Sequence, residues 1–113
     1  MARDKLLLDP FGRRMANIFT AADLARVHKV ADVYWGLDAQ MPPAEVDRFR
    51  EQMDFVVTGY WRYGDVRRFP RLRAILEVSG GFFSPNDLAY DYCFTPGIRV
   101  LSCAPAFAPI VAE

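Results

Sequence analysis

The sequence is poor in the residues that most often carry chemistry. Its 113 residues include one histidine, His28, and two cysteines, Cys93 and Cys103, which lack the C-x-x-C spacing of redox and zinc motifs. A lone histidine with no cysteine near it in sequence gives little support for a metal centre or a Cys/His nucleophile. We therefore expect no metal, two reduced and buried cysteines, and a His28 that packs in the core or at its boundary.

Net charge and long apolar runs are also missing. The 14 Lys and Arg residues balance 14 Asp and Glu residues, so the chain has no general attraction to nucleic-acid phosphates or anionic lipid. No apolar run approaches the roughly 18 residues that span a bilayer, and the run at residues 6–8 is too short for a signal-peptide core. We expect a cytoplasmic protein with no nucleic-acid and no membrane partner.

Glycine-rich nucleotide motifs do not occur. Neither G-x-G-x-x-G nor G-x-x-x-x-G-K is present, and residues 9–14 offer one glycine and no hydroxyl to a phosphate. We expect no cofactor to bind this chain by itself, which disfavours the alternative of a small flavin carrier. Asp9 stands alone after its apolar run, which disfavours a receiver domain, because that site needs clustered carboxylates.

The sequence does contain a regular alternation of short apolar runs and amphipathic stretches. The apolar runs are bounded by Pro, Gly or polar residues and are nearly continuous, which is typical of strands buried on both faces. They lie at residues 5–9, 33–35, 55–57, 74–78 and 98–101. The stretches between them predict helices.

Two helix starts are well marked. Thr20 and Asp23 have the spacing of an N-cap and its acidic partner, for a helix whose apolar face runs to Ala31. Pro43 suits the first turn of the next helix, where no amide hydrogen bond is lost. Shorter helices are expected over residues 65–73, 86–94 and 106–113.

This order predicts a single α/β domain over residues 1–113, with a parallel sheet covered by helices. Right-handed crossovers and five strands favour a flavodoxin-like, doubly wound sheet of order 2-1-3-4-5, with the last helix incomplete or missing. Such sheets bind ligands at the carboxyl ends of their strands. The loops at that edge are therefore the candidate site.

The loop after the fourth strand has the strongest signal. Ser79, Gly80 and Gly81 put two glycines after a buried strand, where a backbone can approach a ligand and present amides to a carboxylate. The alternative is an ordinary strand-to-helix turn. An arginine cluster precedes this strand, and we interpret it as a solvated face, with binding of an anionic ligand as the alternative. Its members are Arg62, Arg67, Arg68, Arg71 and Arg73.

Four segments of the second half of the chain occur in a distinctive order. They are L-R-A-I-L-E-V-S-G at 72–80, G-I-R-V-L-S at 97–102, A-P at 104–105 and V-A-E at 111–113. This order of a strand with a glycine loop, Gly-Ile-x-Val, an Asn/Ser-x-x-Pro turn and a helix beginning Val-Ala-Glu resembles the N-terminal, substrate-binding portion of the D-isomer-specific 2-hydroxyacid dehydrogenases. The chain departs at residues 82–89, where members often have G-x-G-x-D-x-I-D and neither glycine is present.

The resemblance implies a two-domain enzyme that uses NAD or NADP on 2-oxo or 2-hydroxy acids. Its catalytic arginine, glutamate and histidine belong to the dinucleotide domain, which would begin just after residue 113. We expect an isolated substrate-binding domain, truncated and inactive by itself, that binds the small acid at Ser79, Gly80 and Gly81. The alternative is a free-standing flavodoxin-like binding or interaction domain.

The missing last helix would leave an apolar face uncovered. An uncovered apolar face on a chain with no net charge favours a homodimer, through that face or by exchange of residues 106–113.

Overall fold

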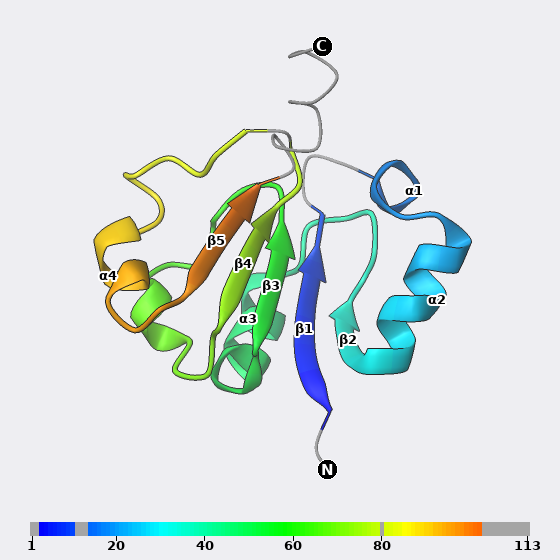
Figure 1. The fold of residues 1–113 in the computed structure, drawn as a ribbon, viewed down its shortest axis with the longest axis horizontal. Helices are drawn as coiled ribbons and strands as arrows, with labels where there is room; N and C mark the ends of the chain where they lie inside the picture. The colour runs from blue at the N-terminus through cyan, green and yellow to red at the C-terminus, as the bar shows by residue number, and fades with distance from the viewer. Residues whose placement is uncertain (1–2, 11–13, 80, 103–113) are drawn as a thin grey trace.

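A computed structural model describes residues 3–10, 14–79 and 81–102 (Figure 1). Its five strands are all parallel and form one sheet in the order β2-β1-β3-β4-β5, which confirms the predicted flavodoxin-like topology. The strands are β1 (Asp4–Asp9), β2 (Ala31–Trp35), β3 (Phe55–Thr58), β4 (Ala74–Glu77) and β5 (Arg99–Ser102). Each predicted apolar run is therefore a strand.

The helices are short. They are α1 (Met15–Ile18), α2 (Ala21–Val30), α3 (Pro43–Phe49) and α4 (Tyr90–Phe94), with 3-10 turns η1 (Arg50–Gln52) and η2 (Val66–Arg68). The capping box predicted at the start of α2 is formed: the Asp23 N–H donates to Thr20 Oγ1 over 3.0 Å, and the Thr20 N–H donates to Asp23 Oδ2 over 3.5 Å. Within the described ranges, every helix falls short of the length and hydropathy that a bilayer crossing requires.

Three helix predictions need correction. Over residues 65–73 only the turn η2 forms, because Pro70 disfavours a helical conformation at Phe69, whose ψ is 78°. Over residues 86–94 the α-helix begins only at Tyr90, because the preceding Ala89 has a non-helical ψ of 85°. Helix α2 ends one residue before Ala31, which is the first residue of β2. The predicted helix at 106–113 lies outside the described residues.

The histidine and cysteine predictions have different outcomes. His28 is exposed, contrary to expectation, because α2 buries none of its residues fully. Cys93 is buried with a free thiol, as predicted, and burial raises the pKa of that thiol. Cys103 lies outside the described residues.

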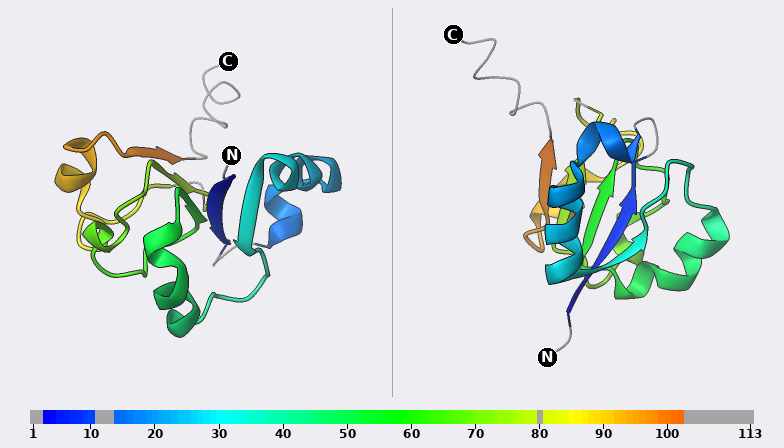
Figure 2. Two further views of the ribbon diagram at one scale, coloured as in Figure 1. Left: turned by 90° about the horizontal axis from the view of Figure 1, so that it is seen from below. Right: turned by 90° about the vertical axis from the view of Figure 1, so that its right-hand side faces the viewer.

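The two faces of the sheet are covered differently. On one face, Leu7, Val56 and Ile75 pack in the main core with residues of α3 and α4 and an aromatic cluster. That cluster consists of Trp61, Tyr63, Phe69 and Phe83. On the opposite face, Leu8 and Val57 pack against α1 and α2. Figure 2 shows these two helices beside β1 and β2, with no described helix over β3, β4 and β5 on that face.

Residues 3–10, 14–79 and 81–102 therefore leave one side of the sheet open at β3–β5. An apolar groove of about 270 Å³ runs there, lined by Leu6, Phe55, Leu76 and Leu101 among others. Leu101 is 50% exposed. We refer to this surface, residues 6, 55–57, 74–76 and 101, as the open face.

Candidate functional site

A row of polar residues crosses the carboxyl edge of the sheet. Asp9 at the end of β1 is in register with Thr58 of β3, and Thr58 is in register with Glu77 of β4. Glu77 is in turn aligned with Ser102 of β5. Residues aligned in this way point to the same face of a sheet, and two positions away along the strands lie Leu7, Val56 and Ile75 of the main core. The row therefore lies over the α3 side, at the edge where such sheets bind ligands.

Three members of this row are fully buried. Asp9, Thr58 and Glu77 have exposed fractions of 1%, 0% and 1%. Polar groups buried to this degree are costly unless they are hydrogen-bonded. Their partners therefore decide what the row can do.

Asp9 has a partner on each carboxylate oxygen. Its Oδ1 accepts a hydrogen bond from the Met41 N–H over 3.2 Å, and its Oδ2 accepts one from the Tyr63 hydroxyl over 2.7 Å. The Tyr63 hydroxyl also lies 2.9 Å from Thr58 Oγ1, which donates to the Tyr60 carbonyl. Burial, and then the charge of Asp9, raise the pKa of Tyr63 well above its usual value, so the phenol keeps its proton.

Glu77 is equally buried but has a partner on only one oxygen. Its Oε1 accepts a hydrogen bond from the Ser79 backbone N–H. Its Oε2 is buried and has no hydrogen-bond partner among the described residues. A Cβ placed on Gly81 would lie 3.6 Å from Oε2, which is an ordinary van der Waals distance, so the backbone of Gly81 lies close to the Glu77 carboxylate.

The predicted loop thus lies directly at this edge. The Ser79 amide is already used by Glu77, and the Ser102 hydroxyl donates to the Gly81 carbonyl. No hydrogen bond joins the Gly81 N–H to another described residue. Gly80 lies outside the described residues. Of the amides expected to bind a carboxylate, that of Ser79 is occupied and that of Gly81 is open.

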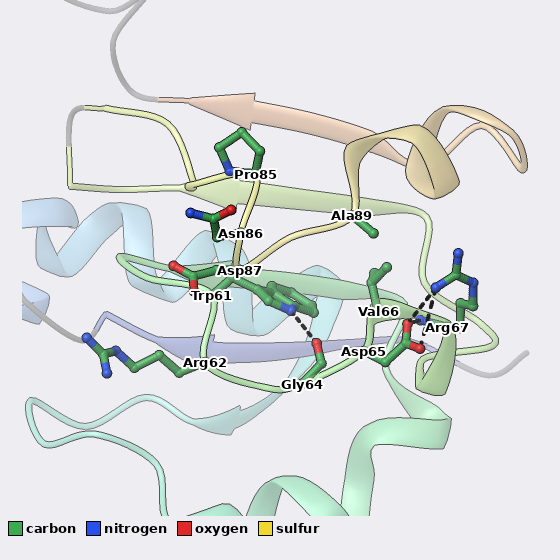
Figure 3. A pocket seen from close by; sticks show the side chains of 10 residues that line it. All are labelled: Trp61, Arg62, Gly64, Asp65, Val66, Arg67, Pro85, Asn86, Asp87 and Ala89. Atoms are coloured by element: carbon green, nitrogen blue, oxygen red, sulfur yellow. Dashed lines mark hydrogen bonds and ion pairs between the residues drawn. The ribbon is translucent and has the colours of Figure 1, made fainter.

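A cavity of about 580 Å³ lies between residues 61–67 and residues 85–89 (Figure 3). Trp61 lines it, and its indole N–H donates to the Gly64 carbonyl over 2.8 Å. Asn86 and Asp87 approach from the other loop, as Figure 3 shows. Neither Ser79 nor Gly81 lines this cavity. It therefore adjoins the aromatic cluster and not the glycine loop.

The sequence reasoning missed most of these residues. The sequence marks Asp9 only as a carboxylate without companions, and it does not single out Thr58, Tyr63 or Glu77. A usable signal is present for two of them, because Asp9 ends its predicted strand and Thr58 follows the last apolar residue of the next one in the sheet. Glu77 is a lone charged residue inside the apolar run 74–78. Tyr63 carries no such mark in the sequence.

The described residues offer little to a metal or a nucleotide. Among them, no group of three His, Cys, Asp or Glu side chains could hold a metal ion. The connection after β1 leads into α1, which is only four residues long and has no side-chain hydrogen bond at its N-cap. A dinucleotide site of this architecture uses a glycine-rich turn that opens a helix. The described end of this connection, with a single glycine in the sequence of residues 9–14, does not fit one.

Comparison with known proteins supports the fold. No protein-family model matches the chain, and no curated protein matches its sequence. Among solved structures, the chain is similar to a phosphoglycerate oxidoreductase from Rhizobium etli, with a TM-score of 0.71 and 21% sequence identity. The match covers 94% of this chain and 32% of that chain, so this chain spans about a third of its neighbour's length. The resemblance predicted from the sequence is confirmed at the level of the fold.

Proposed function

We propose that this chain is the substrate-binding domain of an NAD- or NADP-dependent dehydrogenase that acts on 2-oxo or 2-hydroxy acids. The observation that carries the proposal is the fold match over 94% of the chain to a third of an oxidoreductase. The G-I-R-V and V-A-E segments at residues 97–100 and 111–113 support it independently. Fold by itself does not define an activity, so the site must account for the acid.

The acid is bound through the loop after β4. Glu77 fixes the loop on one side through the Ser79 N–H, and Ser102 fixes it on the other through the Gly81 carbonyl. The Gly81 N–H then donates to the substrate carboxylate, a charge-assisted hydrogen bond of the kind that backbone amides make to anions. Glu77 and Ser102 are positioning residues in this scheme.

The nicotinamide cofactor and the acid–base chemistry belong to another domain. This chain has no nucleotide fingerprint, and its β1–α1 connection does not fit a dinucleotide. We therefore propose that residues 1–113 bind the acid and do not by themselves transfer hydride. We also propose a cytoplasmic location for the enzyme.

Two measurements test this proposal together. The natural gene is read beyond codon 113, and the full-length product and residues 1–113 are assayed for loss of NADH or NADPH absorbance with glyoxylate. We expect a strand–G-x-G-x-x-G–helix unit downstream, activity in the full-length protein and none in residues 1–113. A natural stop codon after residue 113 would contradict the proposal and favour a free-standing binding domain. Reductase activity in residues 1–113 would contradict the proposal that hydride transfer needs a second domain.

We propose in addition that the chain forms a homodimer through the open face. The groove on that face is lined by apolar side chains of four strands, and the chain has no net charge to keep copies apart. Exchange of residues 106–113 between copies is the second form that such a dimer can take.

A further inference from the structure

One oxygen of Glu77 lies beside the loop proposed to bind the acid. Glu77 is 1% exposed, and its Oε1 accepts a hydrogen bond from the Ser79 N–H. Its Oε2 is buried and has no hydrogen-bond partner among the described residues. Since a Cβ built on Gly81 would lie 3.6 Å from Oε2, the Gly81 backbone adjoins this oxygen. An acid held by the Gly81 N–H therefore places a second carboxylate near the first.

Glu77 has no cationic partner in the part of the chain that the structure describes. No lysine or arginine there forms an ion pair with its carboxylate. Its neighbours at the same register are Thr58 on β3 and Ser102 on β5, whose hydroxyl groups carry no charge near neutral pH. The two carboxylates would thus meet without a compensating charge from the adjacent strands.

The titratable groups of the elements around Glu77 do not supply that charge either. On α4, burial and, less strongly, the charge of Glu77 raise the pKa of Tyr90, and burial raises the pKa of the Cys93 thiol. Both groups are therefore neutral near pH 7. Asp91 on the same helix is exposed and negative. Asp9 is also negative and lies two interstrand spacings away, or about 10 Å.

Two carboxylates that share a poorly solvated site cannot both keep their charge cheaply, so one of them takes up a proton. We propose that Glu77 takes up a proton from the solvent when the acid binds at Gly81, and donates it from Oε2 to the bound carboxylate. One solvent proton is consumed for each acid bound, and only an O–H bond forms. Oε1 continues to accept from the Ser79 N–H, so the loop keeps its conformation. This inference rests on the proposed function, which supplies the acid site.

The test is isothermal titration calorimetry of the chain with glycolate at pH 7, in two buffers that differ in ionisation enthalpy. The dependence of the observed heat on that enthalpy gives the number of protons taken up per ligand. We expect close to one proton for the wild type. We expect none for Glu77→Gln, whose amide oxygen can still accept from the Ser79 N–H and whose amide N–H can donate to the acid without titrating.

His28→Asn is the matched control for proton uptake. His28 is the single histidine of the chain, and histidine is the side chain that ordinarily titrates near pH 7. It is exposed on α2, which packs on the opposite face of the sheet from Glu77. This variant should therefore take up the same proton as the wild type.

The pH dependence of Kd is a second readout, and for the wild type it needs no variant. Because binding consumes a proton, we expect the Kd of the wild type for glycolate to rise about tenfold per pH unit between pH 7 and pH 8. The Kd of Glu77→Gln should change less than about twofold over the same range. The variant should consequently gain on the wild type as the pH rises.

Binding of glycolate by the wild type with no proton uptake, or with a Kd independent of pH, overturns this inference and leaves the acid site in place. Proton uptake that persists in Glu77→Gln, or that disappears in His28→Asn, overturns it by assigning the proton to another group. If glycolate does not bind, this inference and the acid site fail together. The gene sequence and the reductase assay then still decide the dehydrogenase assignment.

Discussion

Asp9 and Glu77 lie on either side of β3, at the same edge of the sheet and with the same burial, yet they are bound in different ways. Asp9 has a donor on each oxygen, and its partners tie β1 to residue 41 before α3 and to Tyr63 in the β3–β4 connection. Glu77 accepts a hydrogen bond only from the Ser79 N–H in the turn that follows it, and its other oxygen has no partner in the part of the chain that the structure describes. Because the hydrogen bonds of Asp9 join segments that are far apart in the sequence, we expect this carboxylate to stabilise the fold. Because the hydrogen bond of Glu77 is to a residue two positions away, we expect Glu77 mainly to fix the conformation of the loop after β4.

The largest effect is expected when the Asp9 network is removed. In Asp9→Ala the Tyr63 hydroxyl and the Met41 N–H lose their buried acceptor, so we expect the free energy of unfolding to fall by about 2–4 kcal/mol. Urea denaturation followed by circular dichroism measures it. Asp9→Asn keeps one acceptor oxygen and should cost less. Equal losses in the two variants would show that the hydrogen bonds are not the cause.

A smaller loss, about 1–2 kcal/mol, is expected for Tyr63→Phe near neutral pH. Because burial and Asp9 raise the folded-state pKa of Tyr63, its contribution is complete below the ordinary tyrosine pKa of about 10 and is lost as the pH rises above it. The wild type should therefore lose stability above about pH 10, and Tyr63→Phe should lose less. Tyr90→Phe is the control for the loss near neutral pH, since Tyr90 lies outside the Asp9 network. Because burial also raises the pKa of Tyr90, that variant too should lose less stability at alkaline pH. An identical alkaline loss in wild type and Tyr63→Phe would contradict this account.

For Glu77→Gln we expect a change of less than about 1 kcal/mol, because the amide oxygen can still accept from the Ser79 N–H and a buried charge is removed. The measurement is the same urea denaturation. If this variant costs as much stability as Asp9→Asn or more, the contrast between the two carboxylates is wrong.

The smallest change in stability, within about 0.5 kcal/mol, is expected for Leu101→Lys on the open face. The same variant should convert the proposed homodimer to a monomer, as measured by size-exclusion chromatography with light scattering. Phe94→Lys, a matched change at an exposed hydrophobic residue that does not line the open-face groove, should leave the dimer intact. A wild type that is monomeric at high concentration would refute the dimer.

The sheet could be predicted because its signals are local. Each strand is a short apolar run, and parallel order follows from strand and helix alternation with right-handed crossovers. The capping box at Thr20 is likewise contained in four residues. The helix predicted at 65–73 is wrong because Pro70 disfavours a helical conformation at the residue before it. In the segment 86–94 the backbone is non-helical at Ala89, a residue type that favours helices, so the sequence does not mark this break.

The candidate site was only partly accessible from the sequence. Ser79 and Gly81 could be predicted because two consecutive glycines shortly after an apolar run are a local sequence signal. The bond from Tyr63 to Asp9 joins residues 54 positions apart, and no periodicity encodes such a contact.

The proposed function requires the loop after β4 to bind a small 2-oxo or 2-hydroxy acid through the Gly81 N–H, which has no hydrogen bond to another described residue. An NMR titration of the ¹⁵N-labelled chain with glyoxylate and with glycolate tests it most directly. We expect the Gly81 amide resonance to shift saturably, while the amides of Met41, which is held by Asp9, and Gly97, which precedes β5 at the opposite edge, stay in place. No shift at Gly81, or equal shifts at Met41 and Gly97, would contradict the account.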